Sequence, residues 1–140
     1  MSVQQLMTRD PVTVEMDDTV ATVREIFDHV RFHHLLVVER GRLCGVVSDR
    51  DLFKALSPYL GTPAESSKDA ATLHRRVHQI MSRHPVVIGP HATVFEAVDL
   101  IVERGVSCLP VVDPEGAPLG IVTWRDVLQA LRRTPSAPPA

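Results

Sequence analysis

Long hydrophobic segments are missing from this chain of 140 residues. Its longest apolar runs, such as 35–38, have the length of a β-strand and fall far short of the roughly 20 residues that a bilayer-spanning helix needs. The first residues, 1–4, also lack the charged and then hydrophobic regions of a secretory signal. We therefore expect a cytoplasmic protein without a membrane partner.

An excess of positive charge is also absent. The 15 lysines and arginines are outnumbered by 17 aspartates and glutamates, which gives a formal net charge of −2. Proteins that bind the phosphate backbone of nucleic acids present a basic surface, so nucleic acid is not expected as a partner. The hydrophobic content of 44% is sufficient for a continuous core, and it predicts a globular fold.

Residue groups typical of catalytic and metal sites are scarce. The two cysteines, Cys44 and Cys108, stand in no CxxC or Cys/His spacing, and we interpret them as small buried hydrophobic residues. No G-x-x-x-x-G-K-[ST] phosphate loop and no nucleophile with an adjacent base is visible. His74 and His78 have the spacing of two metal ligands on one helix face, but no third ligand is nearby, which favours an ordinary exposed helix. The sequence predicts no metal, no required cofactor and no enzymatic activity.

What the chain does contain is an internal repeat. Residues 7–12, Met-Thr-Arg-Asp-Pro-Val, match residues 81–86, Met-Ser-Arg-His-Pro-Val, at an offset of 81 − 7 = 74. One residue is added in a later turn, after which 45–51 matches 120–126 at an offset of 120 − 45 = 75. A single insertion at a turn is the expected result of a duplication.

Each repeat has the periodicities of a βαββα unit. A short strand is predicted at 12–14 and again at 86–88. Thr19 and Thr93 are good N-cap residues for helices with one buried face. Two apolar strands joined by a glycine-containing turn follow, and then a second helix. We expect these strands at 35–39, 43–48, 109–113 and 119–123, and these helices at 49–56 and 124–132.

The predicted domain limits are 1–60 for the first repeat, 61–76 for a linker with the start of a connecting helix, 77–133 for the second repeat and 134–140 for a proline-rich, disordered tail. The connecting helix is expected to run to about residue 79. A small three-stranded repeat cannot bury its apolar face alone. We therefore predict an α/β (α+β) domain in which two repeats pack sheet to sheet with pseudo-two-fold symmetry.

The motifs Leu-Leu-Val-Val-Glu at 35–39 and Gly-Val-Val-Ser-Asp-Arg-Asp-Leu at 45–52, with their counterparts at 109–113 and 120–127, resemble the signature of cystathionine-β-synthase (CBS) domains. These domains occur as tandem pairs called Bateman modules. The resemblance covers about residues 4–131. It implies two symmetry-related clefts that hold AMP, ADP, ATP or another adenosine derivative, including NAD or S-adenosylmethionine, and it implies a homodimer.

The resemblance places the ligand at two strand-to-helix junctions. Asp51 and Asp126 would accept hydrogen bonds from ribose hydroxyls, assisted by the hydroxyl groups of Ser48 and Thr123. A second interpretation stays open, because Ser or Thr followed three residues later by an acid also resembles a capping box that only closes a helix end.

Further candidate ligand residues come from matched positions in the two repeats. The backbone of Val12 and Val86 would meet the adenine edge. Residues before the central strands would approach the ligand, and arginines beside the key acids could add charge; these are His33, His34, Ser107, Cys108, Arg50 and Arg125. Packing roles for the histidines and solvated positions for the arginines remain alternatives.

The first helix of the second repeat has a narrow polar stripe, mainly Glu96, Asp99 and Glu103. It leaves Phe95, Leu100 and Val102 as surplus apolar surface, which predicts a homodimer formed through this helix. The first functional hypothesis is a regulatory module whose ligand occupancy alters the dimer or an unidentified protein target. The alternative is a structural or assembly dimerisation protein with vestigial nucleotide clefts, and an enzyme is a third.

Overall fold

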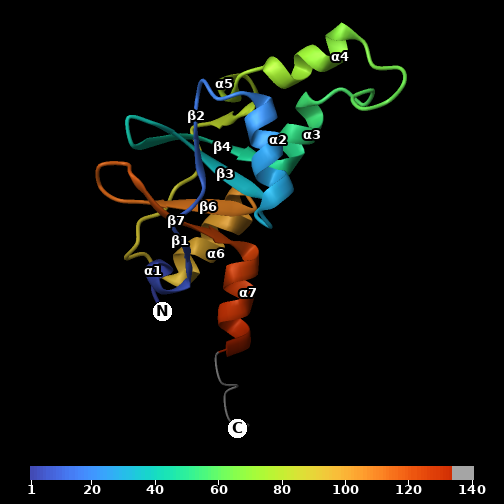
Figure 1. Ribbon diagram of the computed structural model, residues 1–140. Helices are drawn as coiled ribbons and strands as arrows, with labels where there is room; N and C mark the ends of the chain where they lie inside the picture. Colours follow the sequence, from blue (N-terminus) through green and yellow to red (C-terminus); the bar gives the residue numbers. More distant parts are fainter. Residues whose placement is uncertain (134–140) are drawn as a thin grey trace. The chain divides into compact units, whose positions relative to one another are not determined.

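The computed structural model describes residues 1–133, which form two compact units (Figure 1). Unit 1 combines Met1–Pro11 with the chain from Val86 onward, and unit 2 is Val12–Pro85. The chain passes from one unit to the other directly after Pro11 and again after Pro85. Each unit therefore contains parts of both sequence repeats. The predicted tail at 134–140 lies outside the described residues.

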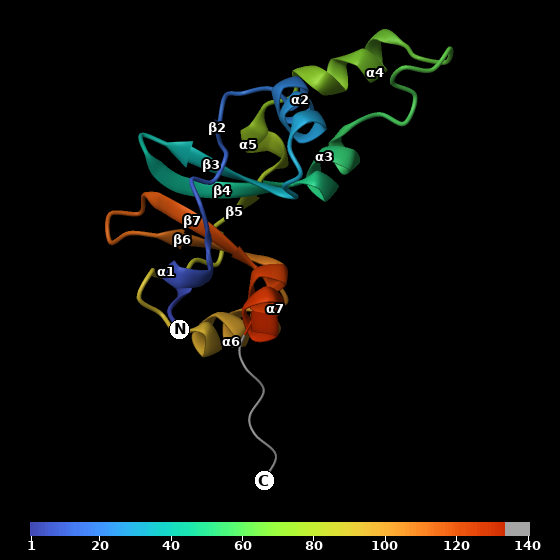
Figure 2. The same cartoon turned by 60° about the horizontal axis from the view of Figure 1, so that its bottom comes forward.

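Unit 2 contains one four-stranded sheet in the order β2-β3-β4-β5. Strand β2 runs parallel to β3, and the other pairs are antiparallel. Figure 2 shows α2 and α3 on one side of this sheet. The elements are β2 (Thr13–Glu15), α2 (Val20–His29), β3 (His34–Glu39), β4 (Arg42–Ser48), α3 (Asp49–Ala55), α4 (Ser67–Ala71), a 3-10 helix η1 (Thr72–His74), α5 (Val77–Ile80) and β5 (Ser82–Arg83).

Unit 1 contains a three-stranded antiparallel sheet in the order β1-β7-β6. Its elements are α1 (Val3–Leu6), β1 (Thr8–Arg9), α6 (Val94–Arg104), β6 (Cys108–Val112), β7 (Pro118–Thr123) and α7 (Trp124–Arg133). The alternation of helices and sheets confirms the α/β fold with two repeats. The sheet-to-sheet packing of the repeats stays a prediction.

The first segment of each repeat pairs with strands of the other repeat, in the same register. Thr8 of β1 lies opposite Ile121 of β7, and Ser82 of β5 lies opposite Val46 of β4. The helical turns before them are held alike: the Val3 amide donates to the Ala92 carbonyl at 2.8 Å, and the Val77 amide donates to the Asp18 carbonyl at 2.8 Å. This exchange is why the compact units cut across the sequence repeats.

The repeated Met-x-Arg-x-Pro motif explains how the exchanged segments fit. A β-carbon built on Gly120 would lie 2.6 Å from the Met7 sulfur, and one on Gly45 would lie 2.6 Å from the Met81 sulfur. Only glycine leaves space for a methionine at this distance. The residue before each proline, Asp10 or His84, has a positive φ of 53° or 54°, a conformation in which Asp and His are enriched among non-glycine residues.

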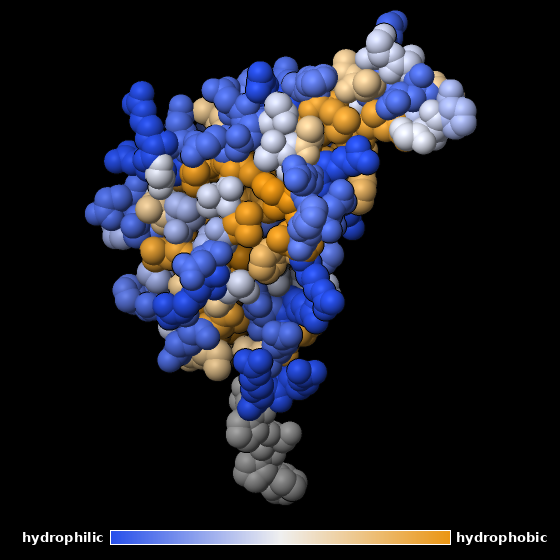
Figure 3. Space-filling view, viewed as in Figure 1, coloured by the Kyte–Doolittle hydropathy of each residue, from blue (hydrophilic) through white to orange (hydrophobic). Residues whose placement is uncertain are grey.

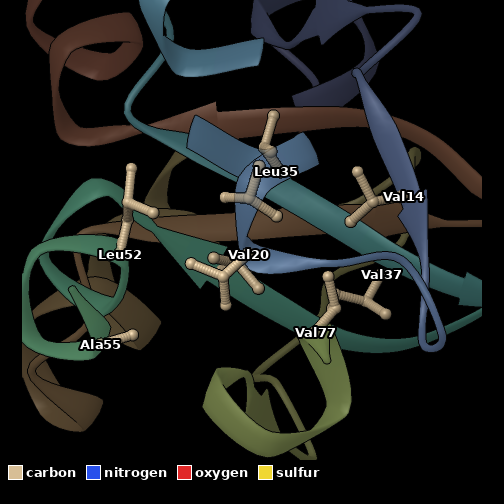
Figure 4. Close-up of a cluster of buried hydrophobic side chains, with 9 residues drawn as sticks. Val14, Val20, Leu35, Val37, Leu52, Ala55 and Val77 are labelled. Carbon is tan, nitrogen blue, oxygen red and sulfur yellow. The ribbon is translucent and has the colours of Figure 1, made fainter. Parts of the chain in front are cut away.

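Each unit has its own hydrophobic core between sheet and helices. In unit 2, Leu35, Val37 and Val47 from the sheet pack with Val20 and Val23 from α2 (Figure 4). In unit 1, Leu109, Val111 and Val122 pack with Val3, Ala97 and Val127. The side chains of Leu35 and Leu109, at matched positions, are both 0% exposed. The four consecutive residues Leu35–Val38 of β3 are all buried, so this strand is covered on both faces, and the core residues named above supply the face toward the helices.

The helices begin at the predicted residues. The Thr19 hydroxyl accepts a hydrogen bond from the Thr22 amide, and the Thr93 hydroxyl accepts one from the Glu96 amide. Both threonines are therefore N-caps, as expected. At Thr93 the cap is reciprocal, because the Glu96 carboxylate accepts from the Thr93 amide at 2.8 Å.

The strand expected at 86–88 is absent. Only Ile88 makes an isolated parallel bridge, to Val111, whereas the matched segment in unit 2 forms the three-residue strand β2. The neighbouring strand explains the difference. Leu36 of β3 donates its amide hydrogen to the Val12 carbonyl, but the matched residue of β6 is Pro110, which has no amide hydrogen to donate.

The continuous helix expected up to residue 79 is also wrong. The backbone of Arg75 and Arg76 is extended, with ψ angles of 150° and 153°, which separates η1 from α5. Tertiary hydrogen bonds override the local helical preference here, because the Arg75 carbonyl accepts from the Val20 amide at 2.8 Å. His74 and His78 therefore belong to different helices and do not share a helix face.

The prediction of a buried cysteine is confirmed for Cys108 but not for Cys44. Cys108 is buried, Cys44 is half-buried, and both are free thiols. Within residues 1–133 no helix has the length and apolar character needed to cross a membrane. The same part of the chain holds no group of three or more His, Cys, Asp or Glu residues arranged to bind a metal ion.

Candidate functional site

In unit 2 the candidate site lies where β4 ends and α3 begins. The Ser48 amide donates to Oδ2 of Asp51 at 2.8 Å, and the Asp51 amide donates to the Ser48 hydroxyl at 3.1 Å. This is a complete capping box. The two side chains are therefore fixed at the strand-to-helix junction, and both are half-buried.

Unit 1 repeats this arrangement between β7 and α7. Oδ2 of Asp126 accepts from the Thr123 amide at 2.8 Å and from the Thr123 hydroxyl at 3.1 Å. The Asp126 amide lies 3.4 Å from the same hydroxyl. The capping interpretation of the sequence is thus correct in both units, and it concerns the same oxygen atom, Oδ2, in each carboxylate.

The other carboxylate oxygen, Oδ1, has a different environment. No residue within 1–133 donates a hydrogen bond to Oδ1 of Asp51 or Asp126. Every buried side-chain oxygen of this part of the chain has a partner, so both Oδ1 atoms reach the surface. A carboxylate oxygen can accept two hydrogen bonds. Capping therefore leaves each acid with an accessible acceptor, and the two interpretations of the motif are compatible.

The histidines of unit 2 lie beside this junction, as predicted. His34 is opposite Ser48 in the β3–β4 ladder, and Nδ1 of His33 lies 2.9 Å from Oδ2 of Asp49. Burial lowers the pKa of His34 against the opposing effect of the nearby Asp49 carboxylate. Because burial favours the neutral form of His34, this residue is a poor candidate for a positively charged partner of a phosphate group.

The matched positions in unit 1 carry different chemistry. Cys108 lies opposite Thr123, and burial raises the pKa of its thiol to about 12, so the thiol stays uncharged. Ser107 is exposed, and its carbonyl accepts from the Trp124 amide at 3.4 Å, as the His33 carbonyl accepts from Asp49 at 3.0 Å. The backbone at the two junctions is therefore alike while the side chains differ.

Val12 and Val86 are half-buried residues at the start of the edge segment of each unit, directly after the exchange points. Val12 is held to the sheet, because its carbonyl accepts from the Leu36 amide at 3.1 Å. Arg50 and Arg125 are exposed in the first turn of their helices, which leaves both side chains accessible to a ligand or to water.

The comparison of the two repeats could have identified one further residue, Asp49. Asp49 and Trp124 occupy matched positions of the two repeats, at an offset of 124 − 49 = 75. The junction of unit 2 therefore has a carboxylate where the junction of unit 1 has an indole. The structure adds that Asp49 contacts His33 and that Trp124 is 55% exposed.

A separate hollow of about 700 Å³ lies beside the β3–β4 turn. It is lined by Glu39, Arg40, Arg42, Leu43 and Cys44, and it includes none of the predicted site residues.

Comparison with known proteins identifies the repeat. The family model described as CBS domain matches the chain twice, at residues 3–58 and 77–133. The chain belongs to the CBS domain family. Its two matched regions are the two halves of a tandem CBS pair, in agreement with the resemblance seen in the sequence.

A relative in sequence and two solved structures support this assignment. A CBS domain-containing protein of Dictyostelium discoideum is 36% identical over 131 residues, which cover 92% of this chain and 90% of that protein. Among solved structures, CBSX2 in complex with AMP is similar with a TM-score of 0.78 and 27% identity, covering 94% of this chain and 96% of that one. The cytosolic domain of the Mg²⁺ channel MgtE in complex with ATP has a TM-score of 0.68 and 32% identity, covering 89% of this chain and 46% of that one.

Proposed function

We propose that this protein is a non-catalytic sensor that binds an adenosine-containing ligand, AMP, ADP or ATP, at the Ser48/Asp51 and Thr123/Asp126 junctions. The observation that carries the proposal is the accessible Oδ1 of Asp51 and Asp126, since Oδ2 of each acid already closes a helix. The complexes of CBSX2 with AMP and of the MgtE domain with ATP support this ligand class.

Ribose chemistry fits the accessible oxygen. Two adjacent hydroxyl groups of a ribose can both donate to one carboxylate, and hydrogen bonds to an ionised acceptor are shorter and stronger than those between neutral groups. NAD and S-adenosylmethionine carry the same ribose and remain alternative ligands. Packing of the two sheets against each other, which would place both junctions in clefts between the repeats, stays a prediction, as does the cytoplasmic location.

Ligand occupancy would act on the protein by shifting an equilibrium. A ligand changes the population of two states only when it binds one of them more tightly. We propose that an occupied site favours one arrangement of the repeats or of a dimer, and that a partner protein responds to this arrangement. The regulated partner is not identified by the residues of the sites.

The test is calorimetric titration of AMP, ADP and ATP into the wild-type protein and the variants Asp51→Asn and Asp126→Asn. Asparagine keeps one oxygen for the cap but replaces the other by an NH₂ group, which removes the charged acceptor. Each substitution should weaken one site by roughly 10- to 100-fold, the loss expected for a charge-assisted hydrogen bond. Binding by the double variant with wild-type affinity would remove these acids from the sites.

Asp69→Asn is the matched control for this titration. Oδ2 of Asp69 accepts from the Ser66 amide at 2.7 Å, so this acid also belongs to a capping box. It lies in α4 and belongs to neither strand-to-helix junction. An equal loss of affinity in Asp69→Asn would show that the substitutions act through helix stability and not through ligand contacts.

A structural or assembly protein is the second candidate function. It is favoured by the complete capping of both motifs, which gives Asp51 and Asp126 a role without any ligand. This candidate predicts a persistent dimer that binds no AMP, ADP, ATP, NAD or S-adenosylmethionine. The titration described above therefore distinguishes the two functions.

We also propose a homodimer formed through α6 and α7. Phe95 and Val102 of α6 are 80% and 73% exposed, and Leu128 and Leu131 of α7 are 53% and 60% exposed. The expectation for Leu100 is wrong, because this half-buried residue packs against the unit 1 core. Exposed apolar side chains also reach the surface of unit 2, where α3 leads into the loop before α4 (Figure 3).

The charges on α6 and α7 favour a second copy of the chain as the partner that covers their exposed apolar residues. Exposed residues of α6 include Asp99 and Glu103, whereas those of α7 include Arg125 and Arg132. In a two-fold dimer the α6 helix of each copy can face the α7 helix of the other, which pairs opposite charges around the apolar residues. Sedimentation should show a dimer that Phe95→Asp weakens, and a wild-type mass of 15.5 kDa at micromolar concentration would reject it.

A further inference from the structure

The turn between β3 and β4 of unit 2 contains an arginine in an unfavourable conformation. Arg40 and Gly41 are the two turn residues, and their φ angles are positive, 52° and 77°. Hairpin turns of this kind usually have Asn-Gly or Asp-Gly, because a long side chain is strained in the left-handed region. Strained residues of this sort gather at functional sites, so Arg40 is a candidate for a role beyond the turn.

Arg40 also lines the hollow of about 700 Å³ beside this turn. That volume is within the range of small-molecule sites, about 300–1,000 Å³. Burial and the nearby Glu39 carboxylate raise the pKa of the Cys44 thiol, so this part of the lining is uncharged. The hollow therefore combines apolar residues, Leu43 and Cys44, with the charged residues Glu39, Arg40 and Arg42.

The opposite charges of the hollow are not paired with each other. Glu39 and Arg42 lie directly opposite in the β3–β4 ladder, a position in which opposite charges readily attract. Within residues 1–133, no carboxylate lies within 4.0 Å of the Arg40 or Arg42 guanidinium group, and the side chains of all three residues make no hydrogen bond. Solvation is an ordinary explanation for exposed charges. It does not explain why a strained arginine occupies the turn beside a hollow.

The matched hairpin of unit 1 is built differently. Its turn is closed by Asp113, whose Oδ1 accepts from the Glu115 and Ala117 amides, both at 2.9 Å. Cys44 and Leu119 are matched at an offset of 119 − 44 = 75, and each is the extra residue of a β-bulge. Leu119 packs against the unit 1 core, whereas the shorter Cys44 side chain leaves space at the same position of unit 2. The features that form the hollow are therefore specific to the unit 2 hairpin.

We propose that this hollow binds a zwitterionic α-amino acid with an apolar side chain. The α-carboxylate accepts hydrogen bonds from the guanidinium groups of Arg40 and Arg42, and the ammonium group donates to Glu39. The apolar side chain contacts Leu43 and Cys44. A simple anion would leave Glu39 unpaired, and a simple cation would leave both arginines unpaired, so a ligand with both charges fits the lining best.

This site is independent of the proposed adenosine site. The hollow lies at the start of β4, and the Ser48/Asp51 junction lies at its end. A strand of this length, Arg42–Ser48, separates its two ends by about 20 Å. An amino acid and a nucleotide could therefore occupy unit 2 at the same time.

The experiment is a titration of L-leucine into the ¹⁵N-labelled full chain, followed by NMR. Leucine should shift the amide signals of residues 39–44 in a saturable way. The analogue 4-methylpentanoate lacks the amino group and 3-methylbutylamine lacks the carboxylate, so each should bind roughly tenfold more weakly. No saturable shift of these signals at millimolar leucine, or equal binding of either analogue, would overturn the proposal and leave the adenosine-sensing function in place.

Three variants separate ligand contacts from stability. Arg42→Gln removes one cation and should weaken leucine binding roughly 10- to 100-fold. Arg40→Gly should weaken it similarly with little change in melting temperature, because glycine adopts a positive φ without strain. Cys44→Leu introduces the residue that unit 1 has at this bulge, and it should reduce binding by filling the hollow.

Arg104→Gln is the control for these variants, because it removes an exposed arginine of unit 1 and should leave leucine binding unchanged. Leucine affinity equal to that of the wild type in folded Arg40→Gly or Arg42→Gln would contradict the proposed contacts. An equal loss in Arg104→Gln would show that only the overall charge of the protein matters, and this result would also overturn the proposal.

Discussion

Units 1 and 2 have similar backbone arrangements at their candidate sites but different side chains around them. In both units, a segment from the other repeat packs against a glycine of the sheet. The helix after the last central strand is capped by Ser48 with Asp51 in unit 2 and by Thr123 with Asp126 in unit 1. The first amide of this helix donates to a backbone carbonyl in both units. Around these fixed features, unit 2 has His33, His34 and Asp49, whereas unit 1 has Ser107, Cys108 and Trp124. Duplication of the scaffold has therefore left two sites with separate chemistry.

The difference in charge is local. The unit 2 junction adds a carboxylate at Asp49, which His33 contacts, while the unit 1 junction has an uncharged thiol and a half-exposed indole. The Asp49 carboxylate would repel a phosphate group at the unit 2 junction, whereas the matched residue of unit 1 is the uncharged Trp124. Comparison of matched substitutions in the two units is the way to separate shared architecture from these differences.

The largest effects are expected in the two cores. Leu35→Ala and Leu109→Ala should each lower the free energy of unfolding by about 2–5 kcal/mol, because both side chains are fully buried. Urea denaturation measures both values, which should agree within about 1 kcal/mol if the cores are equivalent. Leu128→Ala, at a position 53% exposed, is the control, with an expected change below about 0.5 kcal/mol. A core variant as stable as this control would contradict the symmetric packing.

The glycines under the exchanged segments should reveal an asymmetry. A β-carbon at Gly120 would lie 2.6 Å from the Thr8 carbonyl oxygen, but one at Gly45 would lie 3.0 Å from the Ser82 carbonyl oxygen. A backbone oxygen moves less easily than a methionine side chain. Gly120→Ala should therefore lower the free energy of unfolding by about 1–3 kcal/mol relative to the wild type, and Gly45→Ala should lower it by less. Gly89→Ala, which meets no atom within 4 Å, should behave like the wild type in the same thermal melts.

The N-caps of α2 and α6 predict a smaller difference. Thr93→Ala removes a reciprocal cap with Glu96, whereas Thr19→Ala removes a cap that no acid returns. Thr93→Ala should therefore cost about 1 kcal/mol or slightly more, and Thr19→Ala somewhat less. Thr93→Ser keeps the hydroxyl and should retain stability in urea denaturation. Equal losses in Thr93→Ser and Thr93→Ala would exclude capping as the cause.

The smallest effect concerns pH. Burial holds the pKa of His34 below its ordinary value of 6.5, so the unfolded chain binds the proton more readily than the folded protein. The contribution of His34 to stability is present above pH 6.5 and is lost as the pH falls through its folded-state pKa. His34→Gln should therefore reduce the loss of stability on acidification from neutral pH. Cys108→Ser, at the matched position, should not, because a thiol with a pKa of about 12 stays neutral throughout.

Local patterns predicted most of the elements because capping and strand periodicity involve neighbouring residues. Thr19, Thr93 and the Ser48-x-x-Asp51 motif were interpretable for this reason. The exchange of first segments between repeats was not predictable, since the pairing of Thr8 with Ile121 joins residues far apart in the chain. The break at Arg75 was missed for the same reason, because a distant amide, that of Val20, fixes its carbonyl.

At the candidate sites, the sequence predicted which residues gather but not how their atoms are used. The choice between capping and ligand binding by Asp51 could not be decided from spacing, because both roles need an acid at the same position. The structure separates them by atom, with Oδ2 in the cap and Oδ1 accessible. Likewise, the effect of Pro110 on the segment 86–88 depends on which backbone carbonyl its matched residue in unit 2 contacts.

The most direct test of the proposed sensing role is a crystal structure of the protein with AMP. The account predicts ribose hydroxyls within hydrogen-bond distance of Oδ1 of Asp51, of Asp126 or of both, while Oδ2 of each acid remains bonded to the Ser48 or Thr123 amide. AMP bound elsewhere, with both carboxylates directed only at their own helices and at solvent, would contradict it.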